Sequence, residues 1–270
     1  MPTPPHRHLL YQRAVQCVQA EVDFVDATFR ALRGRPPRRM REDFCGTAAT
    51  CAEWVRRGPR REALGVDLDG ETLDWGRAHN LGRLTPARAR RVELRRRDVR
   101  APGPGADRMD AILAMNFSYW VFKTRSALRG YFRSVRRSLG REGVFFMDIY
   151  GGWESMKPQR ERRPIGGGGR RGRGFIYWWE QESFDPITHR LVCHISFSLP
   201  GRWRIRRAFT YDWRLWTIPE VREVLAEAGF SRSSVYWEGD DGKGGGNGEF
   251  TLAQTAEADP CVLAYIVAER

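Results

Sequence analysis

The residues Glu42-Asp43-Phe44-Cys45-Gly46-Thr47-Ala48 decide the fold that we expect for this chain. They follow a short predicted strand, Arg38 to Phe44, and run into a predicted helix, Ala49 to Arg57. A small residue such as Gly46 at such a junction lets the backbone approach a cofactor closely. In open α/β sheets, ligands bind at the carboxyl ends of the strands, where this junction lies.

Three further sites follow predicted strands along the chain. Asp67 ends the buried run Ala63 to Asp67, and an acid there can accept hydrogen bonds from both ribose hydroxyls of a nucleoside. Asp98 follows the next short strand with Val99; it is suited either to the exocyclic amine of adenine or to a surface ion pair. The run Ala114 to Trp120 places polar and aromatic residues after an apolar strand, where they would face a reaction centre.

The remaining periodicity predicts an α/β fold. Strands alternate with helices up to an apolar strand at Gly143 to Ile149, which indicates a parallel sheet with helices on both faces. One amphipathic helix is expected at Leu9 to Leu32. Later runs predict an antiparallel insertion and a closing helix and strands: Phe175 to Phe184, Arg190 to Leu199 and Trp203 to Trp213 as strands, Thr217 to Ala228 as the helix, and Ser233 to Trp237 and Val262 to Ala268 as the last strands.

From Arg41 to Ile149 the chain resembles the class I methyltransferases that use S-adenosylmethionine (SAM). Their glycine-rich motif reads acidic-x-Gly-x-Gly-x-Gly. Here Glu42 matches the acid and Gly46 the middle glycine, while Phe44 and Ala48 replace the outer glycines. The resemblance implies a seven-stranded Rossmann-like sheet with a small antiparallel β insertion after the fifth strand. It also implies these cofactor-binding residues: Glu42, Phe44, Cys45, Gly46, Asp67, Leu68, Asp98, Val99 and Asn116.

The expected organisation has five parts. They are an N-terminal helical cap (1–37), a SAM-binding core (38–156), a flexible loop rich in arginine and glycine (157–174), the antiparallel insertion (175–216), and a C-terminal helix with two strands that complete the core sheet (217–270). A second Gly-rich loop is predicted between Gly239 and Gly248.

A looser resemblance, to small-molecule N-methyltransferases of the glycine/sarcosine and amino-sugar type, rests on Asn116-Phe117-Ser118, the insertion, and the Thr217-Ile218-Pro219-Glu220 helix start. It implies transfer of a methyl group to a small molecule, more often an amine. Candidate substrate residues are Tyr11, Tyr119, Tyr150, Trp153 and His194. No catalytic base is assigned, because an amine needs only to arrive unprotonated.

The amino-acid composition leaves other functional classes of protein open. The net charge of +13 comes almost entirely from arginine, with three lysines only, and an RNA methyltransferase or RNA-associated protein is the main alternative. A non-catalytic Rossmann-like protein and a nicotinamide-dependent oxidoreductase rank lower. The five scattered cysteines favour reduced thiols and no metal site. No membrane span or secretory signal is predicted, so the expected compartment is the cytoplasm; the sequence does not determine the oligomeric state.

Overall fold

A computed structural model describes residues 6–166, 174–242 and 245–270. The chain divides into two compact units. The larger comprises Val18–Gly151 and Trp216–Arg270, and the smaller comprises the residues up to Cys17 together with Gly152–Leu215. No helix among the described residues is long and apolar enough to cross a membrane.

The larger unit contains an eight-stranded sheet in the order β11-β10-β12-β5-β4-β1-β2-β3. Its strands are β1 (Arg39–Asp43), β2 (Glu62–Asp67), β3 (Val92–Arg96), β4 (Met109–Ala114), β5 (Leu139–Gly151), β10 (Arg232–Asp240), β11 (Gly246–Ala253) and β12 (Val262–Glu269). The five strands from β1 to β5 run parallel, whereas β12 lies antiparallel between β5 and β10. The Rossmann-like sheet is confirmed, with eight strands rather than seven.

The extra strand is β11, which begins within the predicted Gly-rich loop (Gly239 to Gly248) and continues beyond it to Ala253. It forms an antiparallel edge beside β10. Its side chains are mostly exposed, so no alternation of apolar and polar residues marked it in the sequence. Backbone pairing with β10 is what holds it in the sheet.

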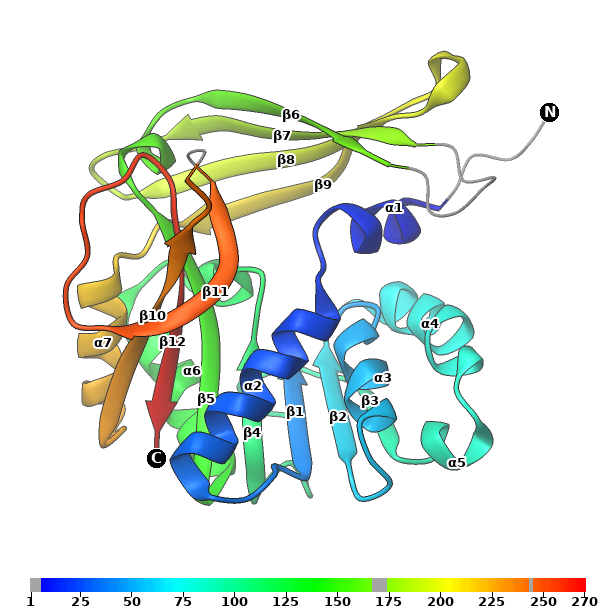
Figure 1. Cartoon of the computed structure of the whole chain (residues 1–270), viewed down its shortest axis with the longest axis vertical. Helices are drawn as coiled ribbons and strands as arrows, with labels where there is room; N and C mark the ends of the chain where they lie inside the picture. Colours follow the sequence, from blue (N-terminus) through cyan, green and yellow to red (C-terminus); the bar gives the residue numbers. More distant parts are fainter. Residues whose placement is uncertain (1–5, 167–173, 243–244) are drawn as a thin grey trace. The chain divides into compact units, whose positions relative to one another are not determined.

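Helices cover both faces of this sheet (Figure 1). They are α2 (Val18–Arg33), α3 (Ala49–Arg56), α4 (Gly70–His79), α5 (Pro86–Ala89), α6 (Arg125–Ser138) and α7 (Ile218–Glu227), with short 3₁₀ helices η1 (Leu81–Arg83) and η2 (Ser118–Val121). On one face, α2 and α3 pack Val25, Phe29 and Trp54 into the core. On the other, the rings of Phe132 and Phe145 join α6 to β5 at 5.7 Å between centroids.

The smaller unit is an antiparallel sheet in the order β6-β7-β8-β9. It comprises β6 (Gln159–Ile165), β7 (Phe175–Phe184), β8 (Arg190–Ser198) and β9 (Arg204–Arg214), with α1 (Arg7–Ala14) and the 3₁₀ helices η3 (Trp153–Met156) and η4 (Pro200–Arg202). Leu10 and Ala14 of α1 pack with Tyr177 and Phe197 of the sheet. The antiparallel insertion after the fifth strand is thereby confirmed.

Two expectations for the boundaries were wrong. The predicted helix Leu9 to Leu32 is divided into α1 and α2, because Leu10 belongs to the core of the smaller unit and Val22 to that of the larger one. Within the predicted loop 157–174, Gln159–Ile165 forms the edge strand β6, paired with β7. Its side chains lie at or near the surface, so no buried face revealed it; residues 167–173 of that loop lie outside the described residues.

Candidate functional site

The turn between β1 and α3 has an unusual backbone. Phe44, Gly46 and Ala48 have φ angles of 57°, 51° and 56°. Left-handed conformations favour glycine, because a Cβ atom crowds the following carbonyl there. The two side chains that replace motif glycines therefore keep the backbone shape that glycines would adopt most easily.

Asp67 at the end of β2 is bonded to this turn. Its Oδ2 accepts the Gly46 N–H at 2.8 Å, and its Oδ1 accepts the Asp69 N–H at 2.9 Å. Burial raises the pKa of the Asp67 carboxyl. A carboxylate has about four lone-pair sites, and the backbone of Leu68 also bonds to this one, so Asp67 retains acceptor capacity for a ligand hydroxyl. The adjacent Leu68 is 65% exposed, which leaves an apolar surface beside the acid.

Glu42 lies behind the turn and not on its surface. Its Oε2 accepts the backbone N–H of Cys51 at 3.2 Å and the thiol of Cys51 at 3.0 Å, which joins β1 to α3. Burial raises the pKa of the Glu42 carboxyl to about 7. Cys45 is also buried, and its backbone N–H donates to the Val66 carbonyl at 3.1 Å. Both residues shape the turn from inside.

Asp98 takes part in the surface ion pair that was one of its two interpretations. Its Oδ2 lies 2.6 Å from Nη2 of Arg100, and its Oδ1 accepts the Arg100 N–H at 2.8 Å. The hydrogen bonds from the Arg100 side chain lower the pKa of the Asp98 carboxyl. Val99 is only 4% exposed and offers a ring little surface, so Leu68 is the exposed apolar neighbour in this set.

Asn116 and Phe117 form a second left-handed turn, after β4, and each has a φ angle of 56°. Their N–H groups donate to the carboxylate of Asp148 at 2.7 and 2.9 Å. Burial raises the pKa of Asp148 to about 7, although the residue keeps some exposed surface. The sequence analysis missed Asp148. Its signal was a single carboxylate in the otherwise apolar run from Val144 to Ile149.

The aromatic residues around this turn separate into a buried and a half-buried group. Tyr119 is fully buried and its hydroxyl donates to the Asp148 carbonyl at 3.1 Å, so it offers no surface to a substrate in this structure. Tyr150 is half-buried, with its ring 4.7 Å from that of Phe117 and 4.8 Å from that of Trp120. Of the tyrosines predicted in the larger unit, Tyr150 is the one with side-chain surface beside the turn.

A buried charged cluster supports the site from the opposite face of the sheet. Arg41 and Asp43 are almost completely buried, with Arg41 Nε 2.8 Å from Asp43 Oδ1. The Tyr131 hydroxyl donates to Asp43 Oδ2 at 2.8 Å, and the Tyr131 ring lies 5.8 Å from that of Phe44. Breaking such a buried pair costs about 3–5 kcal/mol, so the cluster fixes the end of β1.

The other three candidate substrate residues belong to the smaller unit. Tyr11 on α1 packs its ring 4.9 Å from that of Phe209. Trp153 in η3 is 55% exposed. His194 in β8 is buried, with Nδ1 2.9 Å from Thr210 Oγ1 and Nε2 2.8 Å from Glu182 Oε2. The contacts of His194 explain its burial without a substrate.

The sequence analysis also missed the close packing of α4 against the turn between β1 and α3. A Cβ atom on Gly76 would lie 2.4 Å from the carbonyl oxygen of Thr47, and Asn80 Nδ2 donates to the same oxygen at 2.8 Å. Gly65 in β2 likewise leaves room for Cys45 Sγ, which a Cβ atom would approach to 2.8 Å. Gly65 and Gly76 lie outside the glycine-rich motif, so nothing in the sequence indicated that they make close contacts.

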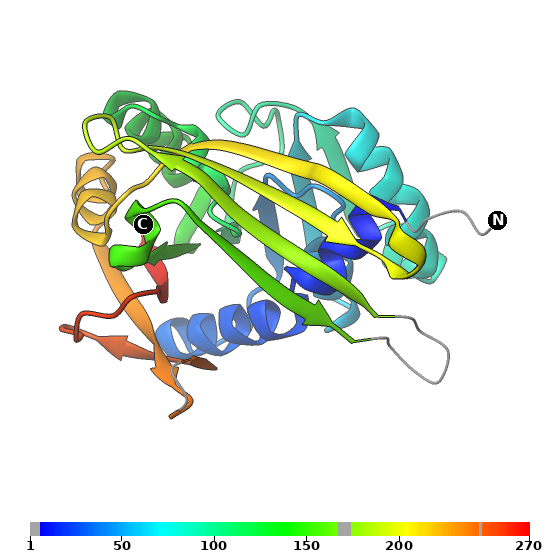
Figure 2. The ribbon, with the colours of Figure 1, turned by 90° about the horizontal axis from the view of Figure 1, so that it is seen from above.

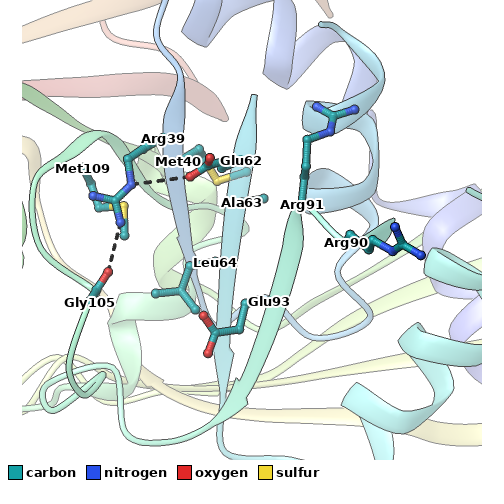
Figure 3. A pocket seen from close by; sticks show the side chains of 10 residues that line it. All are labelled: Arg39, Met40, Glu62, Ala63, Leu64, Arg90, Arg91, Glu93, Gly105 and Met109. Atoms are coloured by element: carbon teal, nitrogen blue, oxygen red, sulfur yellow. Dashed lines mark hydrogen bonds and ion pairs between the residues drawn. The ribbon is translucent and has the colours of Figure 1, made fainter. Parts of the chain in front are cut away.

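One pocket of about 200 Å³ lies at the opposite end of the strands. Arg39 at the start of β1 crosses it, with Nε 3.8 Å from the Glu62 carboxylate and Nη2 donating to the Gly105 carbonyl at 3.1 Å (Figure 3). Ligands of open α/β sheets bind at the carboxyl ends of strands, so this pocket is not the candidate site. No cluster of metal-ligating side chains occurs within the described ranges.

No protein-family model matches this sequence, and no curated protein matches it either. Solved structures do match over nearly the whole chain. CalS10, an amino pentose methyltransferase from Micromonospora echinaspora, has a TM-score of 0.70 at 16% identity, covering 100% of both chains. A SAM-dependent methyltransferase from Clostridium acetobutylicum ATCC 824 has 0.67 at 15%, covering 96% of both chains.

The sugar N-methyltransferase KedS8 from Streptoalloteichus sp. ATCC 53650 has a TM-score of 0.65 at 18% identity, covering 100% of this chain and 94% of the other. Identities this low establish the fold alone. The chain therefore shares the Rossmann-like fold of these methyltransferase structures, and the match extends over its whole length, antiparallel insertion included.

Proposed function

We propose that this chain is a SAM-dependent methyltransferase. The observation that carries the proposal is the bond from the Gly46 N–H to Asp67 beside the left-handed turn at 44–48. It holds together a close-approach backbone and a carboxylate with acceptor capacity left over, which is what the ribose and amino-acid parts of such a cofactor require. The cofactor, when bound, supplies a methyl group on a positively charged sulfur.

We propose a partner in the larger unit for each part of the cofactor. Asp67 would accept the ribose hydroxyls, and exposed Leu68 would pack against the adenine ring. Asp98 would accept the adenine amine in exchange for part of its present bonding, because Arg100 already donates two hydrogen bonds to each oxygen of this carboxylate. Gly46 exposes backbone to the amino-acid end, and buried Glu42 keeps the turn in place from behind.

We further propose a small-molecule amine as the acceptor. The amino pentose and sugar N-methyltransferases that share the fold support this choice. A neutral amine is itself the nucleophile, so this chain has to position it and exclude water rather than remove a proton in advance. The turn at Asn116 and Phe117, fixed by Asp148, offers the backbone and half-buried aromatic surface for that positioning.

The test is calorimetric titration with SAM and with S-adenosylhomocysteine. We expect wild-type protein to bind both ligands and Asp67→Ala to lose affinity by about tenfold or more, since hydrogen bonds to a charged group contribute about 1.5–3 kcal/mol. Asp74→Ala is the matched control, because Asp74 lies exposed on α4 and pairs only with Arg77 in the described structure. Absence of binding in the wild type at millimolar ligand would reject the proposal.

Methyl transfer is then measured with purified protein, labelled SAM and a panel of amino sugars and simple amines. Methylated amine as the product supports the acceptor class. Product from hydroxyl compounds only, or from RNA only, would reject the amine while leaving the cofactor assignment intact.

A further inference from the structure

The amino ends of the parallel strands form a part of the larger unit that the proposed cofactor site does not use. Asp67 lies at the carboxyl end of β2, which is the upper end in Figure 1, and Figure 2 looks down on the carboxyl ends. Two segments lie at the opposite ends of β2 and β3. They are the loop 57–61, which leads from α3 into β2, and residues 86–91, which contain α5 and lead into β3. The two strands pair in parallel, so both segments belong to the same end of the sheet.

Arg91 holds these two segments together. Its Nη1 donates to the carbonyls of Gly58 and Arg61 at 2.6 and 2.7 Å, and its Nη2 donates to the Val55 carbonyl at 3.0 Å. In return, the Arg91 carbonyl accepts the Ala63 N–H at 2.9 Å. The guanidinium of Arg91 is thus occupied within the fold, and its bonds fix the backbone that carries the arginines on either side.

Other arginines at this end of the sheet are paired with acids. Arg57 binds Glu53 and Asp23, and Arg61 binds Asp26. These ion pairs join the loop 57–61 to α2 and α3. Their charges are compensated inside the molecule, so they are not offered to a ligand.

Four further arginines at this end point their charge to solvent. They are exposed, and among the described residues no hydrogen bond or ion pair is found for the side chains of Arg38, Arg60, Arg88 and Arg90. Arg38 precedes β1, and its carbonyl accepts the Glu62 N–H at the start of β2 at 3.0 Å. The other three belong to the two segments that Arg91 joins. We call this set of four the arginine surface.

The two glutamates drawn in Figure 3 each have an arginine of their own. The Glu62 carboxylate lies 3.8 Å from Arg39 Nε, and both oxygens of Glu93 accept from Arg95, at 2.6 and 2.9 Å. The Arg90 guanidinium points away from both glutamates in Figure 3. The charge of Arg90 is therefore left for a partner outside the chain.

The arginine surface is polar, which restricts the kind of partner that it fits. The large apolar side chains that are exposed in the described structure lie elsewhere: Leu68, Val121, Trp153, Met156, Ile187, Trp203 and Leu252. A protein partner would use aromatic or aliphatic anchors here, and single-stranded nucleic acid would use rings on which its bases stack. Interfaces with double-stranded nucleic acid are polar and strongly positive, so they match this surface better.

We propose that the arginine surface docks double-stranded nucleic acid through its phosphate backbone, without reading its bases. Guanidinium groups bind phosphate oxygens through pairs of parallel hydrogen bonds, and such contacts supply essentially all non-specific affinity for nucleic acid. A duplex at the amino ends of the strands leaves their carboxyl ends open, so it is a docking partner and not the methyl acceptor. The proposal does not rest on the proposed methyltransferase function.

The test is fluorescence anisotropy of the full chain with labelled duplexes of about 20 base pairs, one of RNA and one of DNA. Each phosphate contact adds about −0.9 to the slope of log K against log salt, so four contacts weaken binding about 100-fold between about 50 and 200 mM salt. We expect Arg38→Gln/Arg60→Gln/Arg88→Gln/Arg90→Gln to bind about tenfold or more weakly, with a flatter slope. Saturating S-adenosylhomocysteine should change neither value. Binding of either duplex with this pattern supports the proposal, and the comparison shows which helix is preferred.

The matched control is Arg133→Gln/Arg137→Gln/Arg204→Gln/Arg206→Gln, which removes the same charge from exposed positions in α6 and β9. All eight side chains are exposed, so both variants are expected to fold, and urea unfolding checks this. An equal loss of affinity in the control would assign binding to net charge and overturn the proposal. Displacement of the duplex by S-adenosylhomocysteine, tighter binding of oligouridine than of either duplex, or no duplex binding at about 100 μM protein in about 50 mM salt would also overturn it.

Discussion

The backbone N–H of Gly46 donates to Asp67 Oδ2 at 2.8 Å, which ties the turn after β1 to the carboxyl end of β2. Because the other oxygen of Asp67 accepts from Asp69, the same carboxylate also fixes the start of α4. One side chain thus sets the spacing between two adjacent strand ends. The left-handed turn beside it is therefore held in place before any ligand binds. The backbone strain of this turn can be measured through protein stability, without a ligand.

Ala48→Gly tests the left-handed backbone of that turn. Ala48 is fully buried with φ 56°, so the substitution removes a buried methyl group but also relieves strain of about 1–2 kcal/mol. We expect the free energy of unfolding in urea to change by less than about 1 kcal/mol. Ala52→Gly, in the interior of α3 and equally buried, should cost about 2 kcal/mol. Equal losses in the two variants would contradict the assigned strain.

Gly76→Ala tests the contact between α4 and the turn. A helix interior normally gains about 1 kcal/mol when glycine becomes alanine, but here the new Cβ would lie 2.4 Å from the Thr47 carbonyl oxygen. We expect a loss of about 1–3 kcal/mol in urea unfolding together with weaker binding of S-adenosylhomocysteine. Gly130→Ala in α6 is the control, since nothing lies within 4 Å of its added Cβ, and it should stabilise the chain. Stabilisation by both substitutions would refute the close packing.

Much of the larger sheet was predictable because its strands are buried. β2, β4 and the part of β5 from Gly143 to Ile149 are mainly apolar runs of strand length, and parallel strands covered on both faces give that pattern. The edge strands β6 and β11 were not predictable, since neither shows a regular alternation of buried and exposed side chains. Pairing with a neighbour, which depends on distant sequence, determines them.

The candidate site was predictable in its acids but not in its backbone. Asp67 follows a buried strand, and that placement is visible in the sequence. The left-handed angles at Phe44, Ala48 and Phe117 are not, because these residue types seldom adopt them and surrounding contacts impose them. Asp148 escaped notice for a related reason, since its role depends on two N–H groups from another strand end.

Glu42→Gln tests the buried carboxyl behind the turn through the pH dependence of stability. Burial raises the folded-state pKa of Glu42 from its ordinary value of 4.5 to about 7. Between these values the folded chain holds a proton that the unfolded chain releases, so this group's contribution to stability is present at the acidic end and declines as pH rises towards 7. The unfolding free energy of wild type should therefore fall relative to Glu42→Gln across that window, by on the order of 3 kcal/mol. The exposed Glu257→Gln serves as the control, measured by urea unfolding at matched pH. Parallel pH curves for wild type and Glu42→Gln would show that the carboxyl is not buried as described.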